Sequence, residues 1–419
     1  MECSSTVSAE KPKLISIYYV VLASLLMLLL QILPWSNGFM TGLFNDYDTG
    51  VYQRLASWIL TGKVPYLEAH QVYPPLDVIM TALPHFSPFG YRSSFIVMNF
   101  LIFWALTYVY WRSVGHGQLS VTSGSVVLLG LPSVLYNIST FNDLWAAGAV
   151  MMAFVLLRSG RYESGIAVLA GGVFLKSYPL FLLPVAFFWV TSQHLEEAAA
   201  ASPLGRIRGY SAALVSRSGF RLVASAVLVA VLISSAATLW TGTSWLTVPR
   251  ANYEHRNTES FVYLLAEYTP LGWTGGTWFA RALWAATLLG AFAFVPLRRF
   301  DNAVRVAIVV VLAISMSLSF HSPHWNLWFI FLFCLIPISL PLLLFLIVYD
   351  INNLLYWPLF SYATPIEVLR PLAREVAVYP ILAQCTLKFA LIAWLLRDAW
   401  RVGVADRCRA TSKTDRPAT

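Results

Sequence analysis

The sequence predicts an all-helical protein that crosses a membrane about twelve times, since segments of roughly 20 apolar residues recur along it. Of its 419 residues 58% are hydrophobic and only 11% are charged, whereas a soluble domain carries about 25% charged residues. Aromatic residues make up 15% of the chain and include 16 tryptophans, which suits the belts that aromatic side chains form at membrane surfaces. This composition excludes a soluble globular enzyme.

The first predicted crossing covers residues 14–33 and follows Lys11 and Lys13. Basic residues beside a crossing favour the cytoplasmic side, so we expect the N-terminus in the cytoplasm. No small-residue cleavage site follows the apolar run, and we therefore expect the helix to be retained and not removed as a signal peptide.

A long polar interval, residues 44–77, comes directly after this crossing and is expected outside the cytoplasm. Apolar side chains recur at helical spacing over residues 49–60, which predicts an amphipathic helix lying on the membrane surface. Gly62 is expected to end this helix, and Pro74-Pro75 to begin the next one.

The later apolar segments complete one transmembrane domain over residues 1–397, with a short segment at 75–86 that is re-entrant or interfacial. Basic residues gather in a predicted cytoplasmic linker, 193–221, and in a cytoplasmic tail, 398–419, and a second outer loop is expected at 240–277. The remaining crossings are expected at residues 93–111, 120–136, 144–157, 166–175, 178–190, 222–239, 279–297, 306–320, 327–348, 351–363 and 376–396.

Two carboxylates in the first outer loop, Asp46 and Asp48, are the leading catalytic candidates. A carboxylate at the membrane surface can act as a general base on an acceptor hydroxyl, or hold a metal ion. The alternatives are a solvated pair of loop acids, or an N-cap at Asp48 for the helix that follows it.

Lys176 interrupts an apolar run, and Pro179 breaks the helix three residues later. A charged residue inside a membrane segment faces protein or water, and a freed backbone is tolerated only beside protein or a cavity. The pattern predicts a cation directed into a polar cavity that suits a phosphate group. The alternative is a lysine that extends from a helix end to the membrane surface.

Three further groups are candidate binding residues. The second outer loop carries His255 and Arg256 among mixed charges, which either bind phosphate or sugar or are simply solvated. Asp143 follows Asn142 at an outer turn and is either a helix cap or a sugar contact. His321 and His324 precede a pair of tryptophans that either stack on carbohydrate or anchor the chain at the membrane surface.

Several classes of site are excluded. Two histidines spaced as in His321–His324 are too few for a metal site, and the four cysteines have no paired spacing. The net charge of +8 is spread over short runs between apolar segments, which excludes a nucleic-acid partner. No glycine-rich nucleotide loop is present, so no cofactor is expected, and a divalent metal is not indicated.

An ordered set of short motifs resembles the GT-C membrane mannosyltransferases, in particular glycosyltransferase family 87 and the catalytic subunit of GPI mannosyltransferase I. The motifs are Asp48-x-x-Val51-Tyr52, Gly62-x-x-Pro65-Tyr66, Tyr73-Pro74-Pro75-Leu76, Lys176-x-Tyr178-Pro179 and the aromatic segment 321–337. The short turn before Asp143, and Trp145 after it, depart from the GPI enzymes and make a GPI acceptor doubtful.

This resemblance implies a GT-C fold and an inverting transfer of mannose from a polyprenyl- or dolichyl-phosphate donor to a lipid-linked or glycan acceptor. It makes Asp48 the general base, with Asp46 as its partner. Donor or substrate contacts are expected from Lys176, Tyr178, Arg256, His255, Tyr52, Tyr73, Asp143, His321 and His324.

The resemblance and the predicted topology imply a multi-pass membrane protein whose active site faces away from the cytoplasm; if the source is a prokaryote, the membrane is the cell membrane. Two other hypotheses remain: a transporter or flippase of polyprenyl-linked lipids, and a non-catalytic partner subunit. A transporter predicts charges spread over several mid-helix positions, whereas in this sequence only Lys176 is expected to lie deep.

Overall fold

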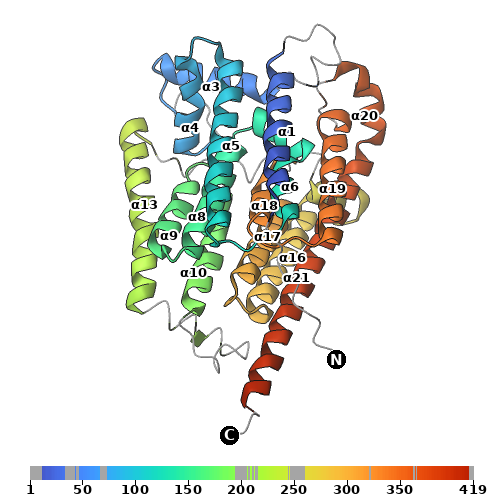
Figure 1. The fold of residues 1–419 in the computed structure, drawn as a ribbon. Coiled ribbons are helices and arrows are strands. Elements are labelled where there is room, and N and C mark those ends of the chain that lie inside the picture. The colour runs from blue at the N-terminus through green and yellow to red at the C-terminus, as the bar shows by residue number, and fades with distance from the viewer. Residues whose placement is uncertain are drawn as a thin grey trace.

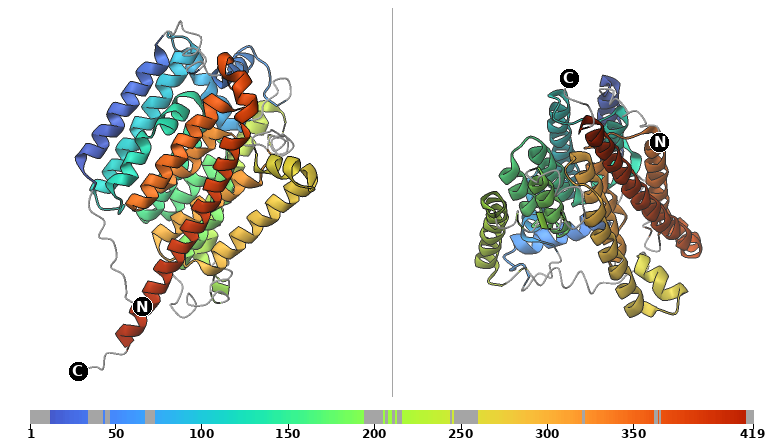
Figure 2. Two further views of the ribbon diagram at one scale, coloured as in Figure 1. Left: turned by 90° about the vertical axis from the view of Figure 1, so that its right-hand side faces the viewer. Right: turned by 90° about the horizontal axis from the view of Figure 1, so that it is seen from below.

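In the computed structural model every secondary-structure element of the described residues is helical (Figure 1). The structure describes residues 12–33, 43, 47–66, 73–193, 205, 208–209, 212, 216–243, 245, 260–319, 322–361, 364 and 366–414. The longer helices lie side by side in a bundle, and the last helix, α21 (Val378–Thr414), extends beyond the others at one end (Figure 2).

Seven helices in the described part of the chain are long and apolar enough to cross a membrane, as expected of a polytopic membrane protein. The number becomes eight if α7 and α8, which are bent by 114° relative to each other, count as one crossing. The seven are α1 (Leu14–Ile32), α5 (Tyr91–Gly115), α13 (Arg217–Thr241), α16 (Gly272–Phe294), α17 (Phe300–Ser317), α19 with η5 (Leu340–Phe360) and Val378–Arg401 of α21.

Several segments predicted as full crossings are shorter helices. Residues 144–157 lie in α8 (Asp143–Arg158), and residues 166–175 lie mostly in α9 (Tyr162–Gly172). The others are divided: 120–136 into α6 (Ser123–Val127), η2 (Leu128–Gly130) and the start of α7 (Pro132–Thr140), 178–190 into η3 (Tyr178–Leu182) and α10 (Leu183–Ser192), and 327–348 into α18 (Asn326–Phe333) and α19.

Prolines cause most of these divisions. Pro132 begins α7, Pro179 and Pro184 lie in the first turns of η3 and α10, and Pro337 separates α18 from α19. Proline lacks the backbone N–H that a helix interior needs but fits a first turn. An average of hydropathy runs over a proline without registering the break, so an apolar segment of crossing length can contain two short helices.

Local signals place other helix ends correctly. Gly62, at φ +89°, follows α3 (Tyr47–Leu60), and α4 (Pro75–Ala82) begins at Pro75 with Pro74 as its N-cap residue. Two segments that the sequence predicts as a loop and a tail contain helix in the structure. The second outer loop contains α15 (Phe261–Tyr268) and the start of α16, and α21 continues through the predicted start of the tail at residue 398.

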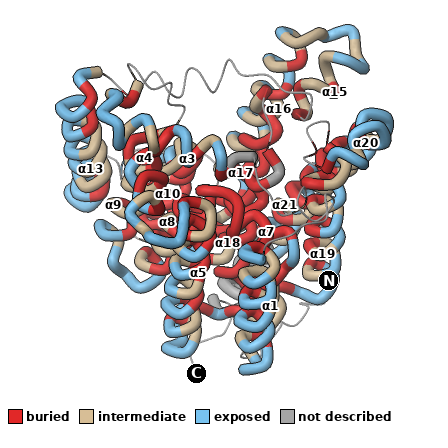
Figure 3. The backbone as a smooth tube through the Cα atoms, turned by 90° about the horizontal axis from the view of Figure 1, so that it is seen from above, coloured by how far each residue is buried: buried red, intermediate tan, exposed pale blue. Residues whose placement is uncertain are grey.

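The centre of the bundle consists of α17 and α18, while α13 and α16 lie at its edge (Figure 3). In α17, 89% of the most apolar 18-residue window is buried, against 11% in α13 and in α16. Apolar residues exposed on α13 and α16 are therefore the surfaces that face lipid. The short helices α3 and α4 pack together at the end of the bundle opposite the C-terminal end of α21 (Figure 1).

Candidate functional site

The candidate site lies where α7 meets α8, beside α3 and α4. The two helices are bent by 114°, with Asn142 and Asp143 at the bend. Backbone groups freed at such a break are tolerated at membrane depth only beside protein or a cavity. Here the chain at the bend packs against α18 and against the turn that follows α9, and side chains from all of these segments meet.

Asp143 is fully buried and lies at the centre of this cluster. Its Oδ1 accepts a hydrogen bond from Trp328 Nε1 at 2.6 Å. Its Oδ2 accepts no hydrogen bond of good geometry within the described part of the chain, but lies 3.6 Å from Lys176 Nζ and 3.2 Å from His324 Nε2. An incompletely hydrogen-bonded carboxylate is costly to bury, so the charge of Lys176 is its main compensation.

A second carboxylate, Asp77, is also fully buried and belongs to the first turn of α4. Asn142 Nδ2 contacts both of its oxygens, at 2.8 and 2.7 Å. The Oδ1 of Asn142 accepts a hydrogen bond from the Tyr52 hydroxyl of α3 at 3.2 Å. Asn142 therefore connects α3, α4 and the start of α8, and it brings Asp77 next to Asp143.

Lys176 lies in the turn between α9 and η3. Its Nζ is 3.6 Å from Asp143 Oδ2 and 4.7 Å from the centroid of the Tyr73 ring, which is a cation–π distance. The Lys176 side chain is 15% exposed, whereas Asp143 is not exposed at all. Lys176 is thus the more exposed partner of this ion pair.

Burial and neighbouring charges set the protonation states. The pKa of Asp77 is raised to about 7, mainly by burial and also by the charge of Asp143, while the charge of Lys176 and the hydrogen bond from Asn142 limit the rise. Burial lowers the pKa of His324 to about 4, against the opposing charge of Asp143. His324 is therefore neutral at pH 7, and its contact with Asp143 is then not an ion pair.

Aromatic rings enclose these polar groups. The Trp328 ring stacks on Tyr178, with centroids 4.3 Å apart, and on Trp325, at 4.5 Å. His324 stacks on Phe141 at 3.9 Å. The tryptophans that the sequence offers as a carbohydrate platform do assemble here, but they are less than 10% exposed and stack on one another. Trp328 holds Asp143 through its indole N–H, and Phe141 packs on His324.

Six of the predicted binding residues converge on this cluster: Lys176, Tyr178, Tyr52, Tyr73, Asp143 and His324. Asp46, His255, Arg256 and His321 lie outside the described residues, as does the side chain of Asp48. Residue 48 itself belongs to α3, which begins at Tyr47, so it lies within the first turn and not at the N-cap position.

The sequence did not identify Asp77 as a site residue, and it did not predict that several charged side chains are buried. Asp77 follows Pro74-Pro75 and looks like an ordinary acid at a helix start, where it stabilises the helix dipole. The prediction that only Lys176 lies deep is wrong, since Asp77, Asp143, Asp350 and Lys388 are each 3% exposed or less. One available signal was position: Asp77 and Asp143 each lie in the first turn of an apolar helix.

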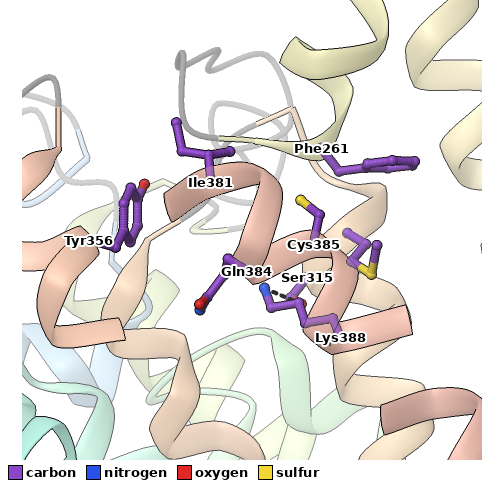
Figure 4. Close-up of a pocket in the computed structure, with 8 residues that line it drawn as sticks. Phe261, Ser315, Tyr356, Ile381, Gln384, Cys385 and Lys388 are labelled. Atoms are coloured by element: carbon purple, nitrogen blue, oxygen red, sulfur yellow. Dashed lines mark hydrogen bonds between the residues drawn. The ribbon is translucent and has the colours of Figure 1, made fainter. Parts of the chain in front are cut away.

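A second polar region, around Lys388 of α21, does not form a comparable site (Figure 4). Lys388 Nζ donates a hydrogen bond to Ser315 Oγ of α17 at 3.1 Å, and the cavity beside it measures about 10 Å³. That volume holds about one water molecule. Such a space is too small for a substrate.

No group of three or more His, Cys, Asp or Glu side chains among the described residues is arranged to hold a metal ion. Comparison with known protein families, with curated proteins and with solved structures finds no match to this chain.

Proposed function

We propose that this chain is an integral-membrane glycosyltransferase that moves mannose from a polyprenyl- or dolichyl-phosphate donor to a lipid-linked or glycan acceptor. The observation that carries the proposal is the position of Lys176, a cation at the edge of a buried cluster with two carboxylates, Asp143 and Asp77. The fold proposed is of the GT-C type, with the site outside the cytoplasm and both termini inside it.

The donor fits this position because its apolar lipid chain and its polar phosphate-sugar group occupy different environments. The polyprenyl chain stays in the bilayer, and the phosphate and sugar lie at the membrane surface. The phosphate then needs a cation that is reachable from the surface, and Lys176, at 15% exposure, offers one. Asp143 and the Tyr73 ring hold the ammonium group in place from the protein side, so it is oriented before the donor binds.

In the proposed reaction the acceptor oxygen attacks the anomeric carbon as its proton passes to a carboxylate base. The new carbon–oxygen bond forms while the bond between the anomeric carbon and the phosphate oxygen breaks, which inverts the anomeric carbon. The bonding electrons leave with the polyprenyl phosphate. Lys176 stabilises the charge that develops on this leaving group.

Asp48 is the proposed base, with Asp46 as its partner, on the strength of the resemblance to GT-C mannosyltransferases. One contact supports this choice. Tyr52, one turn after residue 48 on α3, donates a hydrogen bond to Asn142 at the bend. Residues four apart on a helix share one face, so position 48 is on the same face of α3 as Tyr52.

The test is incubation of the purified protein with polyprenyl-phosphate sugars and candidate acceptors, followed by mass spectrometry of donor and product. We expect consumption of the mannose donor. Asp48→Asn should reduce transfer by about 10²- to 10⁴-fold, the usual contribution of a general base, with unchanged thermal unfolding. Asp301→Asn, in the first turn of α17, is the matched control. Full activity of Asp48→Asn would remove Asp48 from the role of base.

One observation favours a second function, a flippase of polyprenyl-linked lipids. Broken helices with charges at the break are common at transporter binding sites, and the bend between α7 and α8 carries such charges. Liposomes containing the protein separate the two functions. A flippase moves the intact donor to the other leaflet, whereas a transferase releases polyprenyl phosphate and glycosylated acceptor.

A further inference from the structure

A cavity of about 350 Å³ lies between the ends of three helices, away from the candidate site. It is lined at the start of α9 by Arg161 and Glu163, at the end of α10 by Thr191, and at the start of α13 by Ser218 and Arg221. With this volume it can accept a phosphate-bearing group, in contrast to the one-water cavity beside Lys388.

The cavity and the candidate site lie at opposite ends of one helix pair. Asp143 begins α8 and Lys176 follows α9, whereas the cavity lies where α8 has ended and α9 begins. The 16 residues of α8 correspond to about 24 Å at 1.5 Å per residue. A ligand in this cavity is therefore remote from the groups proposed for sugar transfer.

The charged side chains that line the cavity, Arg161, Glu163 and Arg221, carry a net charge of +1. Arg221 Nη2 is 2.6 Å from Glu163 Oε1, an ion pair that neutralises both groups. The Arg161 guanidinium forms no ion pair or side-chain hydrogen bond within the described part of the chain. Arginine presents a planar set of donors that matches a phosphate group in a bidentate arrangement. Arg161 is thus available to a phosphate, and Arg221 can share its donors between Glu163 and the same phosphate.

The position of the cavity indicates where that phosphate comes from. The candidate membrane-crossing segment of α13 runs from Arg217 to Thr241, so Ser218 and Arg221 lie in its first turns, at the depth of lipid headgroups. The outer face of α13 is apolar directly beside the cavity. Phe220 is 68% exposed and Val227 is 52% exposed. A lipid with its phosphate in the cavity can lay its acyl chains along this face.

We propose that this cavity binds the phosphate headgroup of an anionic membrane lipid, with Arg161 as the principal contact and Arg221 as the second. Basic pockets between membrane-crossing helices are suited to such headgroups. The site is independent of the proposed glycosyl transfer, because no group from the Asp143 cluster takes part. Its occupation would hold α13 against α9 and α10.

The experiment measures lipid binding to the detergent-purified protein by native mass spectrometry and by thermal unfolding. Phosphatidylglycerol, phosphatidylcholine and inorganic phosphate are the three ligands. We expect preferential retention of phosphatidylglycerol and a higher unfolding temperature with it. Arg161→Gln should weaken that binding about tenfold, since a charge-assisted hydrogen bond contributes about that factor, and should leave lipid-free unfolding unchanged because Arg161 has no internal partner to lose.

The matched control is Arg112→Gln, an exposed arginine at the C-terminal end of α5, which ends at the same end of the bundle. It should retain normal phosphatidylglycerol binding. Equal loss in both variants would mean a general surface-charge effect and would overturn the proposal. Stabilisation by inorganic phosphate with no preference among lipids would overturn it as well, because the ligand would then be a free anion.

Discussion

Asp350 and Asp143 lie at opposite ends of α7, and both are buried, yet their surroundings differ. Asp350 accepts hydrogen bonds from the backbone N–H of Ser133 at 3.1 Å and from the Ser133 hydroxyl at 2.6 Å, one on each oxygen. Asp143 has one oxygen bonded to Trp328, while the other faces Lys176 and His324 without a hydrogen bond of good geometry.

This difference in hydrogen bonding indicates a structural role for Asp350 and supports the functional role proposed for Asp143. Asp350 satisfies the free N–H groups at the start of α7 and stabilises that helix end, which is the ordinary work of a capping carboxylate. Asp143 keeps an oxygen and a neighbouring cation available for other partners. Burial of a carboxylate therefore does not mark a site by itself; an incomplete set of hydrogen-bond partners beside a partly exposed cation is the stronger indication.

The largest expected effect tests this contrast directly. Asp143→Asn should lower sugar transfer per folded molecule about 100-fold, because Lys176 loses the charge that positions it. Asp350→Asn should instead lower the free energy of unfolding by about 1–3 kcal/mol, through a weakened buried hydrogen bond, with transfer per folded molecule nearly unchanged. Donor-consumption rates and thermal unfolding, measured on both variants, give the answer. Equal loss of transfer activity in the two variants would show that Asp143 and Asp350 do not differ in function.

A smaller effect is expected at the two buried lysines. Lys176→Met should raise the donor KM about tenfold or more, since a charged contact to phosphate is lost. Lys388→Met should leave transfer intact and leave stability unchanged or improved, because replacing a buried charge by an apolar side chain is often neutral or favourable. Steady-state kinetics with a varied donor distinguish the two. An unchanged donor KM in Lys176→Met would exclude Lys176 from the phosphate site.

The third expected effect is a dependence of stability on pH. The folded-state pKa of Asp77 is about 7, above the ordinary value near 4 that applies to the unfolded chain. The folded protein then binds a proton that the unfolded chain lacks, so the contribution of Asp77 to stability is full below about pH 4 and is lost as the pH rises to about 7, by about 1.4 kcal/mol per pH unit at most.

Thermal unfolding between pH 4.5 and 8 checks this sign. The wild-type protein should lose stability between pH 5 and 7 relative to Asp77→Asn, and the difference should become constant above pH 7. Subtracting the two curves removes the titration of other groups. A difference that stays constant, or a wild-type protein that gains stability relative to Asp77→Asn as the pH rises, would contradict the raised pKa of Asp77.

The sequence by itself determines the class of the protein and several of its helix ends. A charged fraction of 11% leaves too few polar side chains for a soluble surface, and Gly62 and Pro74-Pro75 act on the backbone of their own segment. Lys176 could also be singled out in advance, because a charge before Pro179 is unusual in an apolar segment whatever the rest of the fold does.

Only the tertiary structure decided the composition of the candidate site. Asn142 reaches Asp77 across 65 positions of sequence, and Trp328 reaches Asp143 across 185. Helical periodicity predicts which face of a helix is buried, but it does not predict which other helix covers that face. The 114° bend between α7 and α8 and the packing of α18 against them set these pairings. For this reason Asp77 looked like an ordinary helix-start acid in the sequence and emerges as a partner of Asp143 and Lys176 only in the folded chain.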